Sequence, residues 1–184
     1  RMILKSKLLF PEFTGKKPVG AVAKAVHSQG IGNSFNFENS GLQWHEFTYG
    51  TDKPAIRWAS TYDVDSLYII VSDPTSSTDD ISGINVRIEP RRLWPSGEFS
   101  FNNKNENQDN TLREVERSGK KYWIVSIPFR SFWWKGEQLH PVRIDISVKA
   151  GNEVISWRPN NPITSRLVFG TANPQDLGWL IFSE

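Results

Sequence analysis

Five tryptophans in this chain of 184 residues stand at predicted turns and strand ends, beside prolines, glycines or basic residues. They are Trp44, Trp94, Trp133, Trp134 and Trp157. A large aromatic side chain at such a position is costly to expose unless it anchors a loop or contacts a ligand. A flat ring can stack on the apolar face of a pyranose, while polar neighbours bind the sugar hydroxyls. These residues therefore predict a saccharide-binding surface, with loop packing as the alternative.

Arginines accompany these aromatic residues and are suited to donate hydrogen bonds to a sugar. The arginines that we predict to take part are Arg57, Arg87, Arg91, Arg143 and Arg158. Arg87, Arg91 and Arg92 are clustered, and a guanidinium pairs well with a carboxylate. This cluster suggests the hypothesis of an anionic sugar such as a uronate. Pairing of the same arginines with local acids is the alternative.

Several aspartates flank one predicted strand and offer the oxygen ligands that calcium prefers. They are Asp63, Asp65, Asp73, Asp79 and Asp80. The EF-hand spacing is absent, so the favoured interpretation is that these residues cap turns. A structural calcium ion held by Asp63, Asp65, Asp79 and Asp80 is kept as a weaker expectation.

The sequence contains no recognisable catalytic constellation. Its three histidines are widely spaced, it has no cysteine, and Glu114 and Glu116 read as one solvated strand face. We therefore predict a protein without catalytic residues or a cofactor. An enzyme of the polysaccharide lyase or hydrolase type on a jelly-roll scaffold is an alternative. It would need either a tyrosine and histidine set or an arginine and carboxylate set that converges in one groove.

The elements that must position these side chains are strands, because apolar and polar residues alternate with a period of two. Longer strands are predicted at residues 55–60, 66–72, 83–89, 121–129 and 142–150. Shorter strands are predicted at residues 98–101, 112–116, 154–157, 166–169 and 179–182. Gly, Pro and Asn turn signals separate them, so we predict an all-β antiparallel sandwich, jelly-roll-like, of about ten strands. Only residues 19–27 have a weak helical spacing.

Length and composition narrow the class of protein further. The length is typical of one domain, and 22 basic against 20 acidic residues leave a net charge of only +2. That balance disfavours a nucleic-acid or membrane partner. Trp58, Trp123 and Trp179 share faces or runs with apolar residues and are predicted to be core. Residues 1–184 are interpreted as one domain cut from a longer protein, with residues 1–40 less certain.

The order of several segments resembles the family 9 carbohydrate-binding module superfamily and its DOMON-like relatives. The similar stretches are residues 55–73, 80–90, 98–102, 122–132, 142–159, 169–170 and 178–182. The resemblance implies a β-sandwich that binds a polysaccharide or oligosaccharide between aromatic side chains, sometimes with structural calcium. Trp94 and Trp157 would be the aromatic platforms.

The resemblance also implies a biological setting. It suggests an accessory domain of a secreted, periplasmic or cell-surface enzyme that degrades glycans. A structural module that docks on the catalytic domain of a parent glycoside hydrolase is the alternative.

Overall fold

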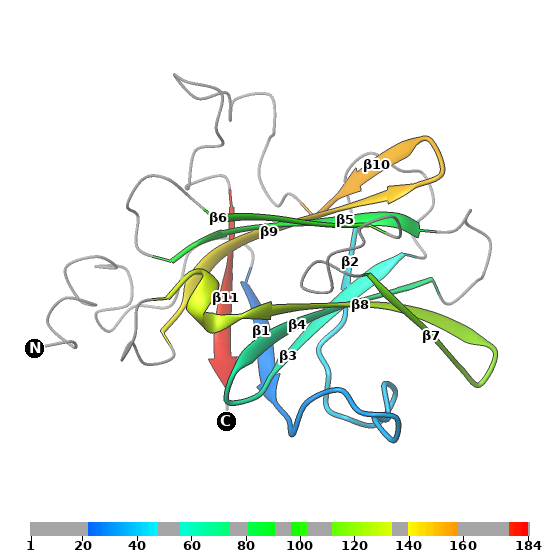
Figure 1. Cartoon of the computed structure of the whole chain (residues 1–184), viewed down its shortest axis with the longest axis horizontal. Coiled ribbons are helices and arrows are strands. Elements are labelled where there is room, and N and C mark those ends of the chain that lie inside the picture. Colours follow the sequence, from blue (N-terminus) through cyan, green and yellow to red (C-terminus); the bar gives the residue numbers. More distant parts are fainter. Residues whose placement is uncertain are drawn as a thin grey trace, which may run out of the picture.

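Two layers of strands face each other and are joined along one side (Figure 1). The computed structural model describes residues 22–47, 56–73, 81–90, 97–102, 112–133, 140–157 and 177–183. The strands are β1 (Val22–His27), β2 (His45–Glu46), β3 (Arg57–Tyr62), β4 (Ser66–Asp73), β5 (Ile81–Glu89), β6 (Gly97–Asn102), β7 (Arg113–Arg117), β8 (Lys120–Pro128), β9 (Val142–Ala150), β10 (Glu153–Ser156) and β11 (Gly178–Ser183). A short 3-10 helix, η3 (Phe129–Ser131), follows β8.

The described strands form a single hydrogen-bonded sheet that curls into the sandwich. Its order is β6-β5-β9-β11-β1-β3-β4-β8-β7, with β10 beside β9 and β2 beside β3. One layer holds β6, β5, β9 and β10, the other holds β3, β4, β8 and β7, and β11 and β1 connect them (Figure 1). All neighbours are antiparallel except that β1 runs parallel to both β11 and β3. The all-β sandwich expected from the sequence is therefore confirmed.

The core lies between the layers because alternate residues of each strand point inward. In β5 the inward residues are Ile84, Val86 and Ile88, and β9 contributes Val142, Ile144, Ile146 and Val148, all of them buried. Strand β4 is buried on both faces, as its nearly continuous apolar run indicates. The strand predicted at residues 166–169 lies outside the described residues. The described part of the chain contains no helix long and apolar enough to cross a membrane.

Strand β1 corrects the weak helical expectation for residues 19–27. Ala23 and Ala25 are fully buried, whereas Lys24 between them is exposed, which is the alternation of a strand. The two alanines mimicked helical composition, but pairing with β11 and β3 supplies hydrogen bonds on both edges of the segment. Strand β2, which the sequence did not predict, pairs with β3 through only two residues.

Candidate functional site

The two outer faces of the sandwich differ in what lies on them. Residues 28–44, which we call the covering segment, pack on the outer face of β4, β8 and β7. They place Ile31 and Phe37 against Ile70, Tyr122 and Ile124. The outward side chains of β5, β6, β9 and β10 form a second surface, which we call the polar face. Its members are Asn85, Arg87, Glu89, Glu98, Ser100, Asn102, Arg143, Asp145, Ser147, Lys149, Val154 and Ser156.

A hydrogen-bond network orders the centre of the polar face. The side-chain amide of Asn85 donates to Glu98 Oε1 at 3.1 Å and to Ser100 Oγ at 2.9 Å. Arg87 approaches the other oxygen of Glu98 at 3.6 Å. These cross-strand contacts hold amide, hydroxyl, carboxylate and guanidinium groups in one partly exposed row. Such a row can bind a ligand that both donates and accepts hydrogen bonds.

Beside this network the polar face is hollowed into a depression of about 570 Å³. Asn85, Ser100, Asn102, Ser147 and Lys149 line it, together with Gly83 and Val154. Gly83 keeps the floor low because it has no side chain; a Cβ there would make only ordinary van der Waals contacts, 3.4 Å from the carbonyl oxygen of Phe101. Val154 is 61% exposed and offers an apolar contact at the rim. The depression thus combines several hydrogen-bonding groups with one small apolar patch.

The other end of the polar face carries a stacked pair of side chains. The guanidinium of Arg143 lies 3.9 Å from the ring centroid of Trp179 and donates to the carbonyl of Leu177 at 2.9 Å. Trp179 is buried as predicted, but it lies under Arg143 on the outer side of the sheet, because its register partner is Arg143. This cation-π contact fixes the orientation of the guanidinium.

The described charges of the polar face balance. The positive charges belong to Arg87, Arg143 and Lys149, and the negative charges to Glu89, Glu98 and Asp145. Arg87 stands directly opposite Asp145, and Arg143 stands opposite Glu89. Arg87, the one described member of the arginine cluster behind the uronate hypothesis, is therefore paired with acids. Arg91 and Arg92 lie outside the described residues.

Trp133 and Trp157 are both buried in the core. Trp157 is therefore not the open aromatic platform that we expected, and Trp133 follows the alternative of loop packing. The backbone N–H of Trp157 donates to the carbonyl of Ile146, so the ring stays inside the sandwich and contacts Trp58 edge to face at 4.8 Å. The N–H of Trp133 donates to the carbonyl of Phe129 after η3, which turns its ring onto that of Phe129. Trp58 and Trp123 are buried, as predicted.

Arg57 lies apart from Arg87 and Arg143, on the face under the covering segment. Its guanidinium is 4.4 Å from the ring centroid of Trp44 and 3.7 Å from Glu38 Oε1. The structure thus brings Arg87 and Arg143 to one face and separates Arg57 from them. The other predicted binding residues, Trp94, Trp134, Arg91 and Arg158, lie outside the described residues.

The carboxylate of Asp63 caps the turn between β3 and β4. One oxygen accepts hydrogen bonds from the backbone N–H groups of Asp65 and Ser66, both at 2.8 Å, and the other accepts from Tyr68 at 2.7 Å. Both oxygens are thus engaged in hydrogen bonds within the protein, as the turn-capping interpretation expects. No group of three potential metal ligands occurs among the described residues, and Asp79 and Asp80 lie outside them. Calcium stays a prediction.

Tyr68 and His45, two partly buried polar residues, form no recognisable catalytic set with their described neighbours. Burial, with the hydrogen bond to Asp63, raises the pKa of Tyr68 to about 12, so its hydroxyl stays protonated at neutral pH and is a poor base. His45 contacts the rings of both Trp58 and Trp157, and burial lowers its pKa. Its environment is aromatic rather than acidic, as in packing histidines.

Sequence reasoning missed the residues that build the depression, above all Asn85, Ser100 and Val154. The alternation of residues 83–89 does place Asn85 on the outward face. It cannot tell which strands lie beside β5, and only this pairing brings Ser100 and Glu98 within reach of Asn85.

No protein-family model and no curated protein matches the sequence. The fold, however, matches solved structures. A family 9 carbohydrate-binding module from Caldicellulosiruptor kristjanssonii in complex with cellotriose has a TM-score of 0.58 at 8% identity, over 88% of this chain and 93% of that one. The chain shares the family 9 carbohydrate-binding fold.

Two further matches agree. The same kind of module with glucose has a TM-score of 0.59 at 9% identity, over 88% of this chain and 95% of that one. A candidate carbohydrate-binding protein from Bacteroides uniformis has a TM-score of 0.53 at 11% identity, covering 89% and 100%. These likenesses confirm the expected fold.

Proposed function

We propose that this protein binds neutral saccharides, without catalysis, in the depression of the polar face. The observation that carries this proposal is the row of Asn85, Ser100, Asn102 and Ser147 around a hollow of about 570 Å³. Amides and hydroxyls can each complement a sugar hydroxyl as donor or acceptor. Val154 and the glycine floor leave room for the apolar face of a pyranose.

Charge and structural likeness support a neutral ligand. Because the described charges of the polar face balance, an acidic sugar would gain little net attraction there. Two of the structural neighbours were crystallised with cellotriose and glucose, which are neutral. We infer from this likeness that the ligand of this chain belongs to the same chemical class.

The test is a titration of the whole chain with glucose, cellotriose and a panel of neutral oligosaccharides, by calorimetry and by NMR of backbone amides. We expect amide shifts in β5, β6, β9 and β10. Asn85→Ala should weaken the affinity about tenfold, because it removes hydrogen bonds to the ligand and loosens Glu98 and Ser100. Asn39→Ala, the same change in the covering segment, should leave the affinity unchanged.

Three outcomes would contradict the proposal. The first is neutral-sugar binding that Asn85→Ala leaves intact, which would place the ligand elsewhere. The second is turnover of the same polysaccharides by the isolated chain, which would make it a lyase or hydrolase. The third is absence of binding across the panel, which would favour the alternative of a module that docks on a parent enzyme.

We further propose, from the family resemblance, that the protein is an accessory to a glycan-degrading enzyme and acts outside the cytoplasm. A secreted, periplasmic or cell-surface location would bring a sugar-binding module to polymeric glycans. Detection of the chain in a culture supernatant, periplasmic or cell-surface fraction would support this location, and its confinement to the cytoplasm would contradict it.

A further inference from the structure

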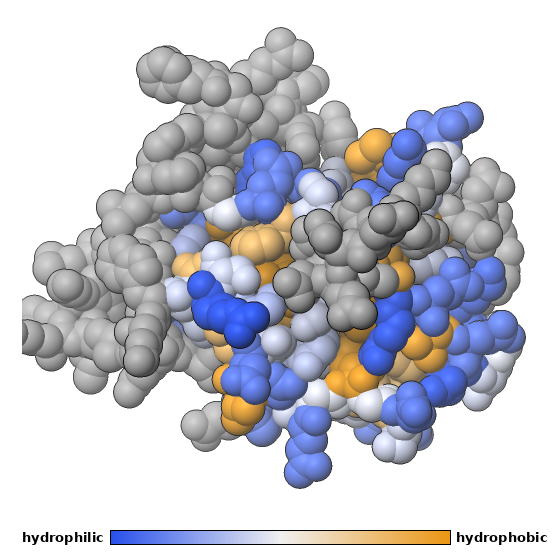
Figure 2. Space-filling model, in the orientation of Figure 1, coloured by the Kyte–Doolittle hydropathy of each residue, from blue (hydrophilic) through white to orange (hydrophobic). Residues whose placement is uncertain are grey.

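A groove lies on the opposite outer face, between the covering segment and the hairpin of β7 and β8. It consists of two depressions of about 350 Å³ and 270 Å³. Both are lined by Asn33, Phe37 and Arg117, so they are adjoining parts of one hollow. The space-filling view shows mostly hydrophilic residues at the side of the molecule where this hairpin lies (Figure 2). Asn33, Ser34, Asn36 and Lys120 are among the residues that line the groove, which shares no lining residue with the depression of the polar face.

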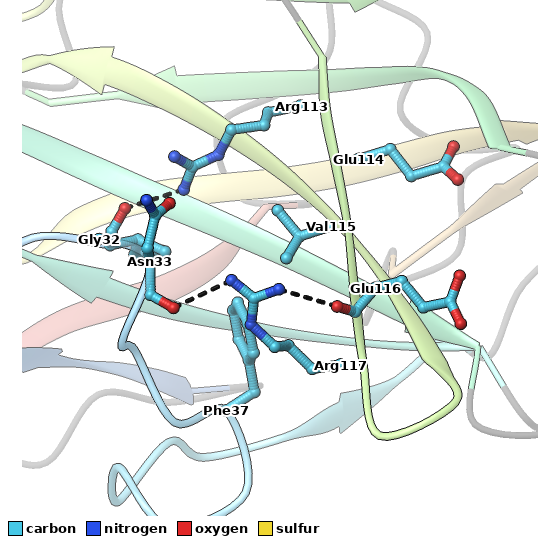
Figure 3. A pocket seen from close by; sticks show the side chains of 9 residues that line it. Gly32, Asn33, Phe37, Arg113, Glu114, Val115, Glu116 and Arg117 are labelled. Atoms are coloured by element: carbon cyan, nitrogen blue, oxygen red, sulfur yellow. Dashed lines mark hydrogen bonds between the residues drawn. The ribbon is translucent and has the colours of Figure 1, made fainter.

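Two arginines are held in place along the groove. Arg113 donates to the carbonyl of Ile31 at 2.9 Å, and Arg117 donates to the carbonyls of Asn33 and Glu116, each at 2.9 Å (Figure 3). A guanidinium has five N–H donors, so both groups keep donors that these bonds do not use. Because the carbonyls already fix the two side chains, a ligand would lose little of its binding energy to their ordering.

On the side of β7 that carries the two arginines, the charged side chains of the groove are mostly cations. Arg113, Arg117 and Lys120 line it. Three carboxylate residues line it as well, Glu38, Glu114 and Glu116, and Glu38 pairs with Lys120 at 3.0 Å. Figure 3 shows Glu114 and Glu116 directed to the other side of β7 from the two arginines. Glu114 pairs there with Lys121 at 3.3 Å. The groove is therefore suited to an anion, in contrast to the balanced polar face.

The aromatic ring of Phe35, which lines the groove's depression of about 270 Å³, adds a stacking surface. Phe35 is half-buried and contacts Phe37 edge to face at 5.1 Å, and Phe37 stacks on Tyr122 at 4.2 Å. Phe37 and Tyr122 are almost fully buried, so they support Phe35 from below. A partly exposed ring beside guanidinium groups matches a ligand that has both an apolar ring face and a negative charge.

We propose that this groove is a second binding site, specific for an acidic saccharide. The carboxylate of a hexuronate unit would be bound by the free donors of Arg113 and Arg117, and a sugar ring would lie against Phe35. Asn33 and Ser34 would bind the hydroxyl groups. This site goes beyond the proposed binding of neutral sugars, differs from it in location and ligand charge, and does not depend on it.

The test titrates the whole chain with a galacturonate trimer, followed by NMR of backbone amides. Cellotriose and sodium acetate serve as separate probes. The proposal expects the trimer to shift the amides of residues 31–38 and 113–120, more weakly as salt is raised. Cellotriose should leave these amides unmoved, and acetate should fail to saturate them at equal carboxylate concentration. Equal effects of cellotriose or acetate, or no response to the trimer, would overturn the proposal.

Variants then locate the contacts. Arg117→Gln should weaken trimer binding about tenfold, because a charge-assisted hydrogen bond is lost. Phe35→Leu should weaken trimer binding severalfold, although this variant keeps both guanidinium groups. It therefore tests the site even if Arg117→Gln disturbs the covering segment. Arg130→Gln removes the same charge from η3 and should leave the affinity unchanged. Unaltered binding in both groove variants would overturn the assignment, whatever cellotriose does at the polar face.

Discussion

Glu38 illustrates how a single side chain ties the covering segment to the sheet. Its Oε1 accepts hydrogen bonds from Tyr122 at 2.7 Å and Lys120 at 3.0 Å, and Arg57 is 3.7 Å away. The hydrogen bonds from Tyr122 and Lys120 lower the pKa of Glu38. Burial and the same carboxylate raise the pKa of Tyr122 to about 12. Both shifts favour the charged carboxylate beside a protonated hydroxyl at neutral pH.

Glu38→Gln is therefore expected to destabilise the protein by about 0.5–1 kcal/mol at pH 7, a modest value because the side chain is partly exposed. The folded pKa of Glu38 lies below the unfolded value near 4.5. Its contribution is complete above that value and is lost as pH falls through the folded pKa. Urea unfolding of both proteins between pH 3 and 8 measures this difference.

The double variant with Tyr122→Phe is the control for that experiment. If the hydrogen bond carries the effect, Glu38→Gln should cost less once the hydroxyl is absent. A difference between wild type and Glu38→Gln that does not change between pH 3 and 8 would contradict the role of the carboxylate charge.

The tryptophans show which side-chain placements the sequence predicts and which it does not. Trp58 and Trp123 were predictable as core because they share strand faces with apolar residues. Trp133 and Trp157 follow strand ends, where alternation no longer states which way a side chain points. A single backbone hydrogen bond from each residue, to Phe129 and Ile146, brings their rings inward. Such bonds depend on the position of another strand or turn.

Among the elements, the β7–β8 hairpin has the clearest local code. Ser118 and Gly119 both have positive φ, 53° and 75°, as a two-residue type I′ turn requires. The two strands pair in continuous register, from Arg117 opposite Lys120 beside the turn to Arg113 opposite Ile124. Gly119 is one of the glycine turn signals between predicted strands, and glycine tolerates such a backbone conformation at little cost.

Substitutions in this turn should move stability in opposite directions. Gly119→Ala should cost about 1 kcal/mol because of strain at positive φ, although the added Cβ meets nothing within 4 Å. Ser118→Asn should add up to about 0.5 kcal/mol, since asparagine is favoured in type I′ turns. Midpoints of urea unfolding measure both, and a loss of stability in Ser118→Asn would contradict the turn type.

Strand β7 ends the path of the described sheet, and its sequence discourages pairing with a second copy. If two copies paired antiparallel about Val115, Arg113 would stand opposite Arg117 and Glu114 opposite Glu116. Like charges directly opposite destabilise such a pair. Arg117 also donates to the carbonyl of Glu116 and so occupies part of the edge. The alternating charges of β7 thus disfavour pairing of this edge with the same strand of a second copy.

At the scale of the whole molecule, β1 joins the two layers. It lies between β11 and β3, and its buried Ala23 and Ala25 contribute to the common core. Because these side chains are small, β1 can pack closely against the core where the sheet bends between the two layers. Residues 22–40, at the weakest part of the family resemblance, thus supply both this strand and most of the covering segment.

Ala25→Leu should therefore destabilise the protein by about 1–3 kcal/mol, because a fully buried position at the bend has no room for three more carbons. Lys24→Leu, an exposed neighbour on the same strand, should change stability by less than about 0.5 kcal/mol. Thermal unfolding with coincident circular dichroism and fluorescence transitions measures both. A wild-type transition in Ala25→Leu would contradict the place of β1 in the core.

The sequence by itself determined the all-β class, the position of most strands and the outward placement of Asn85, Arg87 and Arg143. These follow from the period-two pattern, which is local. Only the tertiary structure decided that Arg57 lies on the other face, that Trp133 and Trp157 are buried, and that Asn85 meets Ser100. The physical reason is that strand pairing joins residues far apart in the chain, and alternation along one strand says nothing about its neighbours.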